Sequence, residues 1–587
     1  MCGFVCVVTK RPLSDTLDVP GFDRDVLKHR GPDSSGELVL ENAYVRHWRL
    51  SIVDVTANAD QPYGDGDSWL IYNGEIYNYD KLGRGPSGPV NGDTALVYRW
   101  CKEGVEEQRL KRARGFYSYL YVRENGLVLS GGRDPFGKKP LFYYIDNAAG
   151  IAAFASEEKA IVDCLKDRQI DFASVSQFLL YKTVFRGRSH FKNIAQLAPG
   201  AHFHFDAREW SFSVDYDWDQ YYQKPAADVF ALDPDPAARS AVASHRLDDV
   251  VYSKLRESFA LRMPREVSAC VALSGGIDSS VIAQMAASEP ALLANITQFV
   301  TVGFEQPDCD ESSRAAEIAR SLGVTAKHAV VKFLQRDLLA YLIQCVEQAS
   351  APLEHPHYLS YYALCRHTAM LSKVLITGEG ADELFMGYEH YATPGRSFAF
   401  REYLSSGDEN CFRAAMAGVA PFDVIRQEAN VSALRAQALS APMLSREYEI
   451  KTHLLSLLDR NDKMGMANSV EIRAPFLDRE ILGLCLALPD SDLVVNGSPK
   501  YVMKQIFARC FPDMKVQEKK IGFRVPFDEV FLEGRRRGRM RDYCEVAVRA
   551  LREECGLGLS SVDNIAPRLG WSLLNIGVFL EAQGYAS

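Results

Sequence analysis

The sequence predicts two folded units of different class, an α+β N-terminal domain of layered sheets and an α/β domain with a parallel sheet and a helical C-terminal region. Three observations predict this. The chain has 587 residues, more than a single hydrophobic core normally organises. Short apolar runs between turn residues dominate residues 1–205, whereas strand and helix patterns alternate farther along the chain. We therefore expect domains over 2–205 and 241–587, joined by a connection over 206–240.

The N-terminal domain is predicted from short apolar or alternating runs separated by Gly, Pro, Asn and Asp. These runs predict strands over 4–8, 37–39, 69–72, 118–122, 127–130 and 152–155. Helical spacing over 94–102 and 157–163 indicates helices that cover the sheets. Residues 206–240 are rich in Asp, Pro and Ala and weakly periodic, so we expect a connection there rather than a core.

The second domain is predicted from an alternation of helices and buried strands. Helices are expected over 247–261, 279–287, 312–322 and 338–348, and strands over 269–273, 299–302, 328–331 and 374–377. Repeated strand and helix units imply a parallel sheet with helices on both faces. From about residue 440 the sequence is mainly helical in pattern.

Composition excludes several classes of protein. The net charge of -9 gives no general attraction for nucleic acid, and the basic run over 535–541 is better explained as a solvated helix face. Thirteen cysteines without CxxC pairs argue against a disulfide framework and a structural zinc site. Neither a signal peptide nor an apolar run of membrane-spanning length is evident. We expect a cytoplasmic protein with no nucleic-acid or membrane partner.

One set of motifs surrounds a cysteine at position 2. The motifs are HRGPD at 29–33, RLSIVD at 49–54, YNGEIYN at 72–78, GDT at 92–94 and GRDPFG at 132–137. Together they resemble the class II glutamine amidotransferase domain, whose fold is the layered αββα sheets of N-terminal nucleophile enzymes. The segment 81–89 departs from that pattern because it is shorter and richer in Gly and Pro, so the glutamine lid can differ.

The chemistry explains these residue types. Removal of Met1 leaves Cys2 with a thiol and an α-amine whose pKa, roughly 7.7 to 8, lets it act as its own base. The resemblance gives stabilisation of the oxyanion to the Asn73 side chain and the Gly74 N–H. It assigns the α-carboxylate of glutamine to Arg49 and the α-ammonium to Asp93. The rest of the glutamine pocket is assigned to Leu50, Ser51, Ile52, Val53 and Glu75.

A second motif, LSGGIDSS at 273–280, stands between an apolar strand and a helix. A Gly-rich turn at a helix start presents backbone N–H groups to phosphate oxygens. The Walker pattern is absent. The motif resembles instead the loop of enzymes that split ATP into AMP and pyrophosphate, in which Asp278 would hold Mg²⁺ on the pyrophosphate.

A third motif, TGEGADELF at 377–385, ends the strand predicted over 374–377. The carboxyl ends of parallel strands meet at one rim, so both motifs should lie together. By resemblance, Asp382 is the second Mg²⁺ carboxylate and Glu379 the acid/base residue for ammonia attack. The resemblance assigns ATP contacts to Ala272, Leu273, Ser274, Gly275, Gly276, Asp278, Ser279, Ser280, Val302, Thr377 and Gly378.

Further stretches resemble the same enzymes: DRNDKM at 459–464, SVEIRAPFLD at 469–478, and the lysines of 500–501 and 519–523. We expect Lys500 first, and Lys520 second, to offset the charge of the departing pyrophosphate. Most of the chain thus resembles the asparagine synthetase B family. This implies a carboxylate activated by ATP with Mg²⁺, amidated by ammonia from glutamine, in a protein that can form a homodimer.

The acceptor carboxylate is the open point, because a fold and an adenylation site do not select it. Aspartate is the default. The segment 350–358 carries His355 and His357 where relatives carry an acidic pattern, so a sugar uronate or a natural-product acid is an alternative. Ordinary packing also explains the histidines. A ring-closing ligase without glutamine use, or a scaffold protein, would not need Cys2, Arg49 and Asn73 together.

Overall fold

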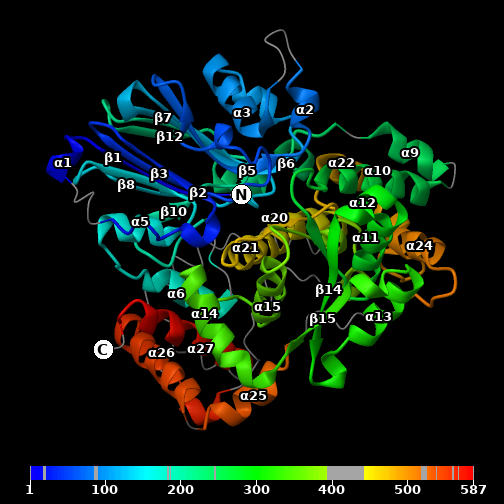
Figure 1. The fold of residues 1–587 in the computed structure, drawn as a ribbon. Coiled ribbons are helices and arrows are strands. Elements are labelled where there is room, and N and C mark those ends of the chain that lie inside the picture. The colour runs from blue at the N-terminus through cyan, green and yellow to red at the C-terminus, as the bar shows by residue number, and fades with distance from the viewer. Residues whose placement is uncertain are drawn as a thin grey trace.

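The structure, a computed structural model, places both kinds of domain in one chain (Figure 1). It describes residues 2–16, 22–84, 90–181, 184, 187–233, 235–243, 246–392, 442–516, 525–536, 538–557, 559, 561–565 and 567–585. Part of the predicted glutamine lid, 85–89, lies outside the described residues, and so do Lys520 and Arg537.

Two six-stranded antiparallel sheets form the N-terminal domain, in the orders β10-β8-β9-β1-β3-β2 and β12-β11-β7-β6-β5-β4. The first comprises β1 (Cys2–Thr9), β2 (Ser34–Val39), β3 (Ala43–Arg49), β8 (Phe142–Asp146), β9 (Ile151–Ala155) and β10 (Ile194–Gln196). The second comprises β4 (Tyr63–Gly64), β5 (Ser68–Ile76), β6 (Gly115–Arg123), β7 (Val128–Arg133), β11 (His202–Asp206) and β12 (Ser211–Val214). The sheets bury one apolar layer that includes Phe4, Ile71 and Phe154.

Helices cover the outer faces of this pair of sheets. Helix α3 (Gly92–Glu103) packs on β5, and α5 (Glu158–Leu165) packs on β9 and β1. The result is four layers, helix, sheet, sheet and helix, as Figure 1 shows in blue and cyan. The predicted α+β class with layered αββα sheets is confirmed.

Residues 206–240, the predicted connection, carry secondary structure of their own. They include the edge strand β12, then α7 (Trp218–Gln223), α8 (Ala226–Val229) and the start of α9 (Pro236–Ala243). Tyr221 and Ala226, in these short helices, are fully buried, so the connection packs against the rest of the protein. Such short helices carry too few turns to show periodicity.

The second domain is built on a five-stranded parallel sheet of order β15-β14-β13-β16-β17. Its strands are β13 (Ala269–Ala272), β14 (Ile296–Phe304), β15 (His328–Phe333), β16 (Val374–Ile376) and β17 (Glu471–Arg473). Around them lie α10 (Leu247–Arg262), α11 (Ile277–Ser288), α13 (Ser312–Ser321), α14 (Leu338–Ala349), α15 (His357–Ala369), α21 (His453–Met466) and α24 (Tyr501–Cys510). Ala269 and Val271 join the core beside α10 and α11, whereas Cys270 and Ala272 join the core beside α14 and α15. Helices therefore cover both faces, as predicted.

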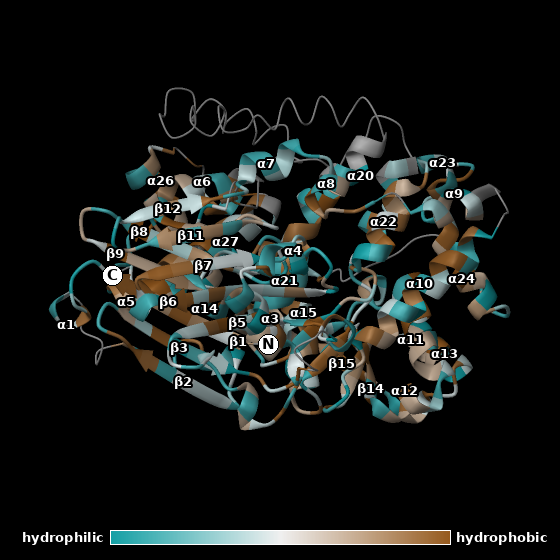
Figure 2. Ribbon diagram, turned by 90° about the horizontal axis from the view of Figure 1, so that it is seen from above, coloured by the Kyte–Doolittle hydropathy of each residue, from teal (hydrophilic) through white to brown (hydrophobic). Residues whose placement is uncertain are grey.

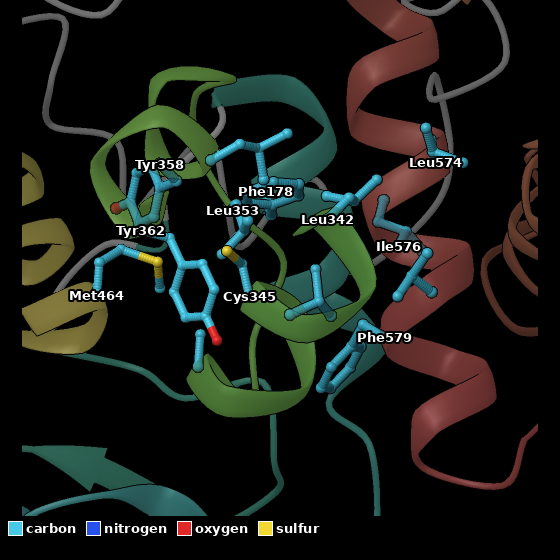
Figure 3. Packing of buried hydrophobic residues seen from close by; sticks show 14 of the residues in the cluster. Phe178, Leu342, Cys345, Leu353, Tyr358, Tyr362, Met464, Leu574, Ile576 and Phe579 are labelled. Carbon is cyan, nitrogen blue, oxygen red and sulfur yellow. The ribbon is translucent and has the colours of Figure 1, made fainter. Parts of the chain in front are cut away.

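The C-terminal helices return to the N-terminal domain. Helices α25 (Phe527–Gly534), α26 (Arg539–Cys555) and α27 (Pro567–Ala582) form an orange and red group beside α6 (Phe172–Tyr181) and α14 (Figure 1). Figure 3 shows this shared core: Phe178 of α6, Leu342 and Cys345 of α14, and Ile576 and Phe579 of α27 point toward one another. The two domains thus share one apolar interior.

Apolar residues lie along the strands and on the inner faces of the helices (Figure 2). Over the part of the chain that the structure describes, no helix combines the length and the apolar character needed to cross a membrane.

Candidate active site

Cys2 begins β1 in the middle of the first sheet, where β1 pairs with β3 and sets Cys2 opposite Arg49. The backbone N–H of Cys2 donates to Asn73 Oδ1 on β5 over 3.0 Å. This bond crosses from one sheet to the other, and it brings residue 2 to the predicted oxyanion residue. The cysteine is buried, with 5% of its surface exposed.

The surroundings of the thiol favour its ionised form. Burial raises the pKa of Cys2, but the N-terminal ammonium, His47 and the Leu50 backbone together lower it to about 6. His47 is fully buried on β3, and its Nε2 lies 3.3 Å from the Tyr72 carbonyl. Because a carbonyl only accepts hydrogen bonds, Nε2 carries the proton in this contact.

Asn73 is oriented to serve an oxyanion. Its Oδ1 accepts from Cys2, so its Nδ2 is the free donor, and Nδ2 is buried without a partner among the described residues. Gly74 follows on the same strand, where a Cβ would lie only 2.2 Å from the Phe116 carbonyl oxygen. Only glycine fits at position 74. The preceding residue, Asn73, supplies the side-chain amide that contacts Cys2.

The predicted glutamine-binding residues lie around this thiol in two groups. Leu50, Ser51 and Ile52 are buried and Val53 is half-buried, and the Ser51 N–H donates to Asp33 over 2.7 Å. Arg49 bonds to Asp60 and to the Thr56 carbonyl, both over 2.8 Å. Its guanidinium therefore also organises the loop that follows β3.

Asp93 and Glu75 form the acidic side of the pocket. Asp93, at the start of α3, accepts from the Tyr72 hydroxyl over 3.1 Å and from the Ile76 N–H over 3.0 Å. Burial raises the pKa of both acids. Nearby positive charge acts in the opposite direction on the pKa of both. A ligand ammonium would find two carboxyl groups on this side of the pocket.

The second predicted site is a cavity of about 450 Å³ at the carboxyl ends of the parallel strands. Its walls include the predicted nucleotide residues Ala272, Leu273, Ser274, Gly276, Asp278, Ser279, Val302, Thr377 and Gly378. Gly275 and Ser280 lie behind the wall, and the Ser280 hydroxyl donates to the Gly276 carbonyl over 2.8 Å. Ser280 thus stabilises the first turn of α11 instead of facing the cavity.

The two nucleotide motifs touch because Gly378 has no side chain. A Cβ there would lie 2.9 Å from Asp278 Cβ and 3.2 Å from the Ser279 backbone nitrogen. Lys500 joins the same corner, since its Nζ lies 2.5 Å from a carboxylate oxygen of Asp278 and 2.5 Å from one of Asp382. The two predicted metal carboxylates therefore converge on the Lys500 ammonium.

The comparisons with known proteins agree with this geometry. The asparagine synthase family model matches residues 250–564, more than half of the chain. The chain belongs to the asparagine synthase family. The glutamine amidotransferase domain model matches residues 1–218, so this member is a glutamine-dependent amidotransferase and a carbon–nitrogen ligase.

Two curated relatives span nearly the whole chain. Asparagine synthetase [glutamine-hydrolyzing] 1 of Bacillus subtilis (strain 168) is 29% identical over 577 residues, covering 90% of this chain and 87% of that protein. A putative asparagine synthetase [glutamine-hydrolyzing] of Mycobacterium tuberculosis (strain ATCC 25618 / H37Rv) is 28% identical, covering 85% and 83%. The solved glutamine phosphoribosylpyrophosphate amidotransferase from B. subtilis aligns at 14% identity over 57% of this chain and 81% of that chain, with a TM-score of 0.27. A score this low supports no structural argument.

The structure of this family member also adds residues that the sequence did not assign. Arg460 of α21 donates to Glu379 and contacts His357 Nδ1 at 3.3 Å, with its guanidinium 4.4 Å from the Tyr361 ring centroid. All four line the cavity. Arg460 belongs to the DRNDKM motif and His357 to the unusual segment 350–358. The sequence therefore pointed to both residues but assigned neither of them a role in the site.

Glu383 and His47 were missed for another reason. Glu383 lines the cavity and bonds to the Tyr388 hydroxyl, and burial raises its pKa to about 8. Within the motif at 377–385 the resemblance assigned a role to Asp382, one position earlier, and none to Glu383. His47 stands two residues before Arg49, and only the pairing of β3 with β1 brings it beside the thiol.

Proposed function

We propose that the chain makes L-asparagine from L-aspartate, with L-glutamine as nitrogen donor and ATP cleaved to AMP and pyrophosphate. The observation that carries this proposal is the presence of both sites in one molecule, a buried low-pKa thiol beside Asn73 and a cavity that joins two nucleotide motifs. Either site alone would support only half of the reaction.

At the first site the Cys2 sulfur attacks the side-chain amide carbon of glutamine. The free Nδ2 of Asn73 and the Gly74 N–H are the donors for the oxyanion that forms. When the carbon–nitrogen bond breaks, ammonia leaves and a thioester remains, which water converts to glutamate. Arg49 and Asp93 would hold the α-carboxylate and α-ammonium of glutamine.

At the second site the acceptor carboxylate attacks the α-phosphorus of ATP, and the bond to pyrophosphate breaks. Ammonia then attacks the activated carbonyl carbon and AMP leaves, and Glu379 would accept the proton that ammonia loses. Lys500 would offset the charge of the departing pyrophosphate. ATP and Mg²⁺ are therefore the nucleotide and metal of this proposal.

The donor set fits Mg²⁺ of the kind that nucleotides bring. No group of three or more potential ligands gathers within the described ranges, but Asp278 and Asp382 converge at the Lys500 ammonium. Mg²⁺ is commonly bound by one or two carboxylates plus phosphate oxygens. Bound there, it would neutralise phosphate charge.

The charges around the cavity favour an amino-acid acceptor. Arg460 and His357 supply cationic or donor groups, and Glu379 supplies a carboxylate, all on the same wall. A zwitterion such as aspartate can use both signs, whereas a uronate has no ammonium to meet the carboxylate. The domain limits 2–205, 206–240 and 241–587, a cytoplasmic location and the homodimer that the resemblance allows belong to this proposal.

The proposal is tested with the Cys2→Ala variant in a screen of carboxylates, with ammonium as nitrogen source and pyrophosphate release as readout. We expect aspartate to elicit pyrophosphate and asparagine, and glutamine to support no synthesis. The wild-type protein, assayed in parallel, should use either nitrogen source. Release with a uronate but not with aspartate would overturn the acceptor, and synthesis from glutamine by Cys2→Ala would overturn the role of Cys2.

A further inference from the structure

Arg473 is a buried cation at the boundary of the two domains that no motif reading assigned to either site. It ends β17, the edge strand of the parallel sheet, with 1% of its surface exposed. Its Nη2 donates to the Glu75 carboxylate, its Nε lies 2.9 Å from Glu471 Oε1, and its Nη1 donates to the Arg262 carbonyl over 2.7 Å. The guanidinium is held from three directions.

The contact with Glu75 crosses from one domain to the other. Glu75 lies on β5 directly after Asn73 and Gly74, and only 7% of its surface is exposed. Burial raises the pKa of this carboxyl, and Arg473 is the main group that lowers it. Without that guanidinium the Glu75 carboxyl would lose the partner that fixes its position beside the oxyanion residues.

The backbone of Arg473 supports the other site. Its carbonyl accepts from the Thr377 N–H over 2.9 Å, at the start of the predicted nucleotide motif. The strand register is the cause, because Ile376 of β16 pairs with Arg473 of β17. The glutamine domain also holds this strand, since Lys138 donates to the Ile472 carbonyl over 2.5 Å.

We infer that Arg473 is a positioning residue for glutamine use: it completes the glutamine pocket from the synthetase domain by holding Glu75, while its carbonyl anchors the nucleotide motif. The inference rests on the proposed function of Cys2. It requires that loss of the Arg473 side chain weaken glutamine use selectively, because the side chain faces Glu75 and only the backbone faces Thr377.

The experiment compares Arg473→Lys and Arg473→Met with the wild-type protein. Lysine keeps the buried charge but lacks the planar guanidinium fork that reaches Glu75, Glu471 and the Arg262 carbonyl together. It is the fallback variant if Arg473→Met does not fold. Glutamate release from glutamine alone measures the first site without any acceptor. Pyrophosphate release with saturating ammonium measures the second site in the same sample. Retained release shows that the variant protein is folded.

We expect kcat/KM for glutamine to fall about tenfold to a hundredfold in Arg473→Met, as a displaced pocket residue commonly causes, and less in Arg473→Lys. Pyrophosphate release with ammonium should stay within about threefold of wild type, since the β17 carbonyl remains. Arg265→Met is the matched control. Arg265 forms an exposed ion pair with Asp80, 3.2 Å across the same boundary, and pairs with Asp80 rather than with Glu75, so neither rate should change.

An equal fall of both rates, or no fall in glutamate release from Arg473→Lys, would overturn the inference. Should wild type itself release no pyrophosphate with aspartate and ammonium, the proposed acceptor fails. The glutamate assay still decides the role of Arg473 in that case, because glutamine hydrolysis needs neither ATP nor an acceptor.

Discussion

The Cys2 thiol is the residue whose reactivity depends most on its neighbours. The thiolate is the nucleophile, and the environment holds the pKa of Cys2 at about 6 in spite of burial. Glutamine hydrolysis should therefore persist through neutral pH and decline below that pKa, where the thiol takes up its proton. His47, which faces the thiol from β3, is one of the groups that lower the pKa.

We expect His47→Gln to move the acid limb of the pH profile of glutamine hydrolysis to higher pH, because a group that favours the thiolate is lost. Glutamate release between about pH 5 and 8, the range in which histidine changes charge, measures it. His202→Gln replaces a partly buried histidine near Tyr119 on the second sheet and should leave the limb in place. An acid limb that His47→Gln does not move would contradict the assigned contact.

At the scale of elements, the turn before α11 and the turn after β16 meet at the predicted nucleotide site, where Asp278 and Gly378 lie beside Lys500. The turn before α11 and the turn after β16 come together only because position 378 has no Cβ. A methyl group there would press against Asp278 and Ser279 backbone, which cannot yield as a flexible side chain can. The two carboxylates near Lys500 would then separate.

Gly378→Ala should therefore reduce ammonium-supported pyrophosphate release by about a hundredfold, as expected for reacting groups displaced by about 1 Å. Glutamate release from glutamine should be unchanged, because Cys2 lies in the other domain. Gly483→Ala is the control, since Gly483 lies in α22 (Arg479–Ala487) and a Cβ there would meet its nearest atom at 3.8 Å. If Gly378→Ala kept normal pyrophosphate release, the two motifs would not form one corner.

At the scale of the whole molecule, buried ion pairs join the domains in addition to the shared apolar core. Arg30 lies 2.8 Å from both Glu157 and Asp462, and Lys139 lies 3.4 Å from Asp462. Burial raises the pKa of Asp462, but Arg30 and Lys139 outweigh it and leave the pKa below its usual value. A carboxylate with a lowered pKa stabilises the fold above its unfolded pKa, about 3.9, and that stability is lost as pH falls.

Asp462→Leu should lower the free energy of unfolding near neutral pH by about 3–5 kcal/mol, because Arg30 and Lys139 keep buried charges without this partner. The midpoint of urea unfolding measures the change, and its dependence on pH below about 4 should be shallower in the variant. Asp65→Asn, which breaks the exposed pair with Lys102, should barely move the midpoint. Equal midpoints for wild type and Asp462→Leu would contradict a stabilising role for the network.

Much of the fold followed from local pattern. Alternating apolar runs marked β6 and β9, and the helical spacing of 247–261 marked α10. Strand β3 was not predicted because its sequence, AYVRHWR, carries three basic or imidazole side chains, although the strand is buried along nearly its whole length. Strand β17 escaped because it has three residues, two of them charged and all buried. Charged side chains that are buried against partners from distant segments leave no periodic signal.

The sequence by itself determined the family, the class of each domain and the motifs of both sites, because short motifs and periodicity are properties of neighbouring residues. Only the tertiary structure decided which neighbours act on those motifs. Glu75 and Arg473 are separated by 398 positions and still share an ion pair, and His47 meets Cys2 only through strand pairing. Such contacts depend on the path of the whole chain, which no local pattern records.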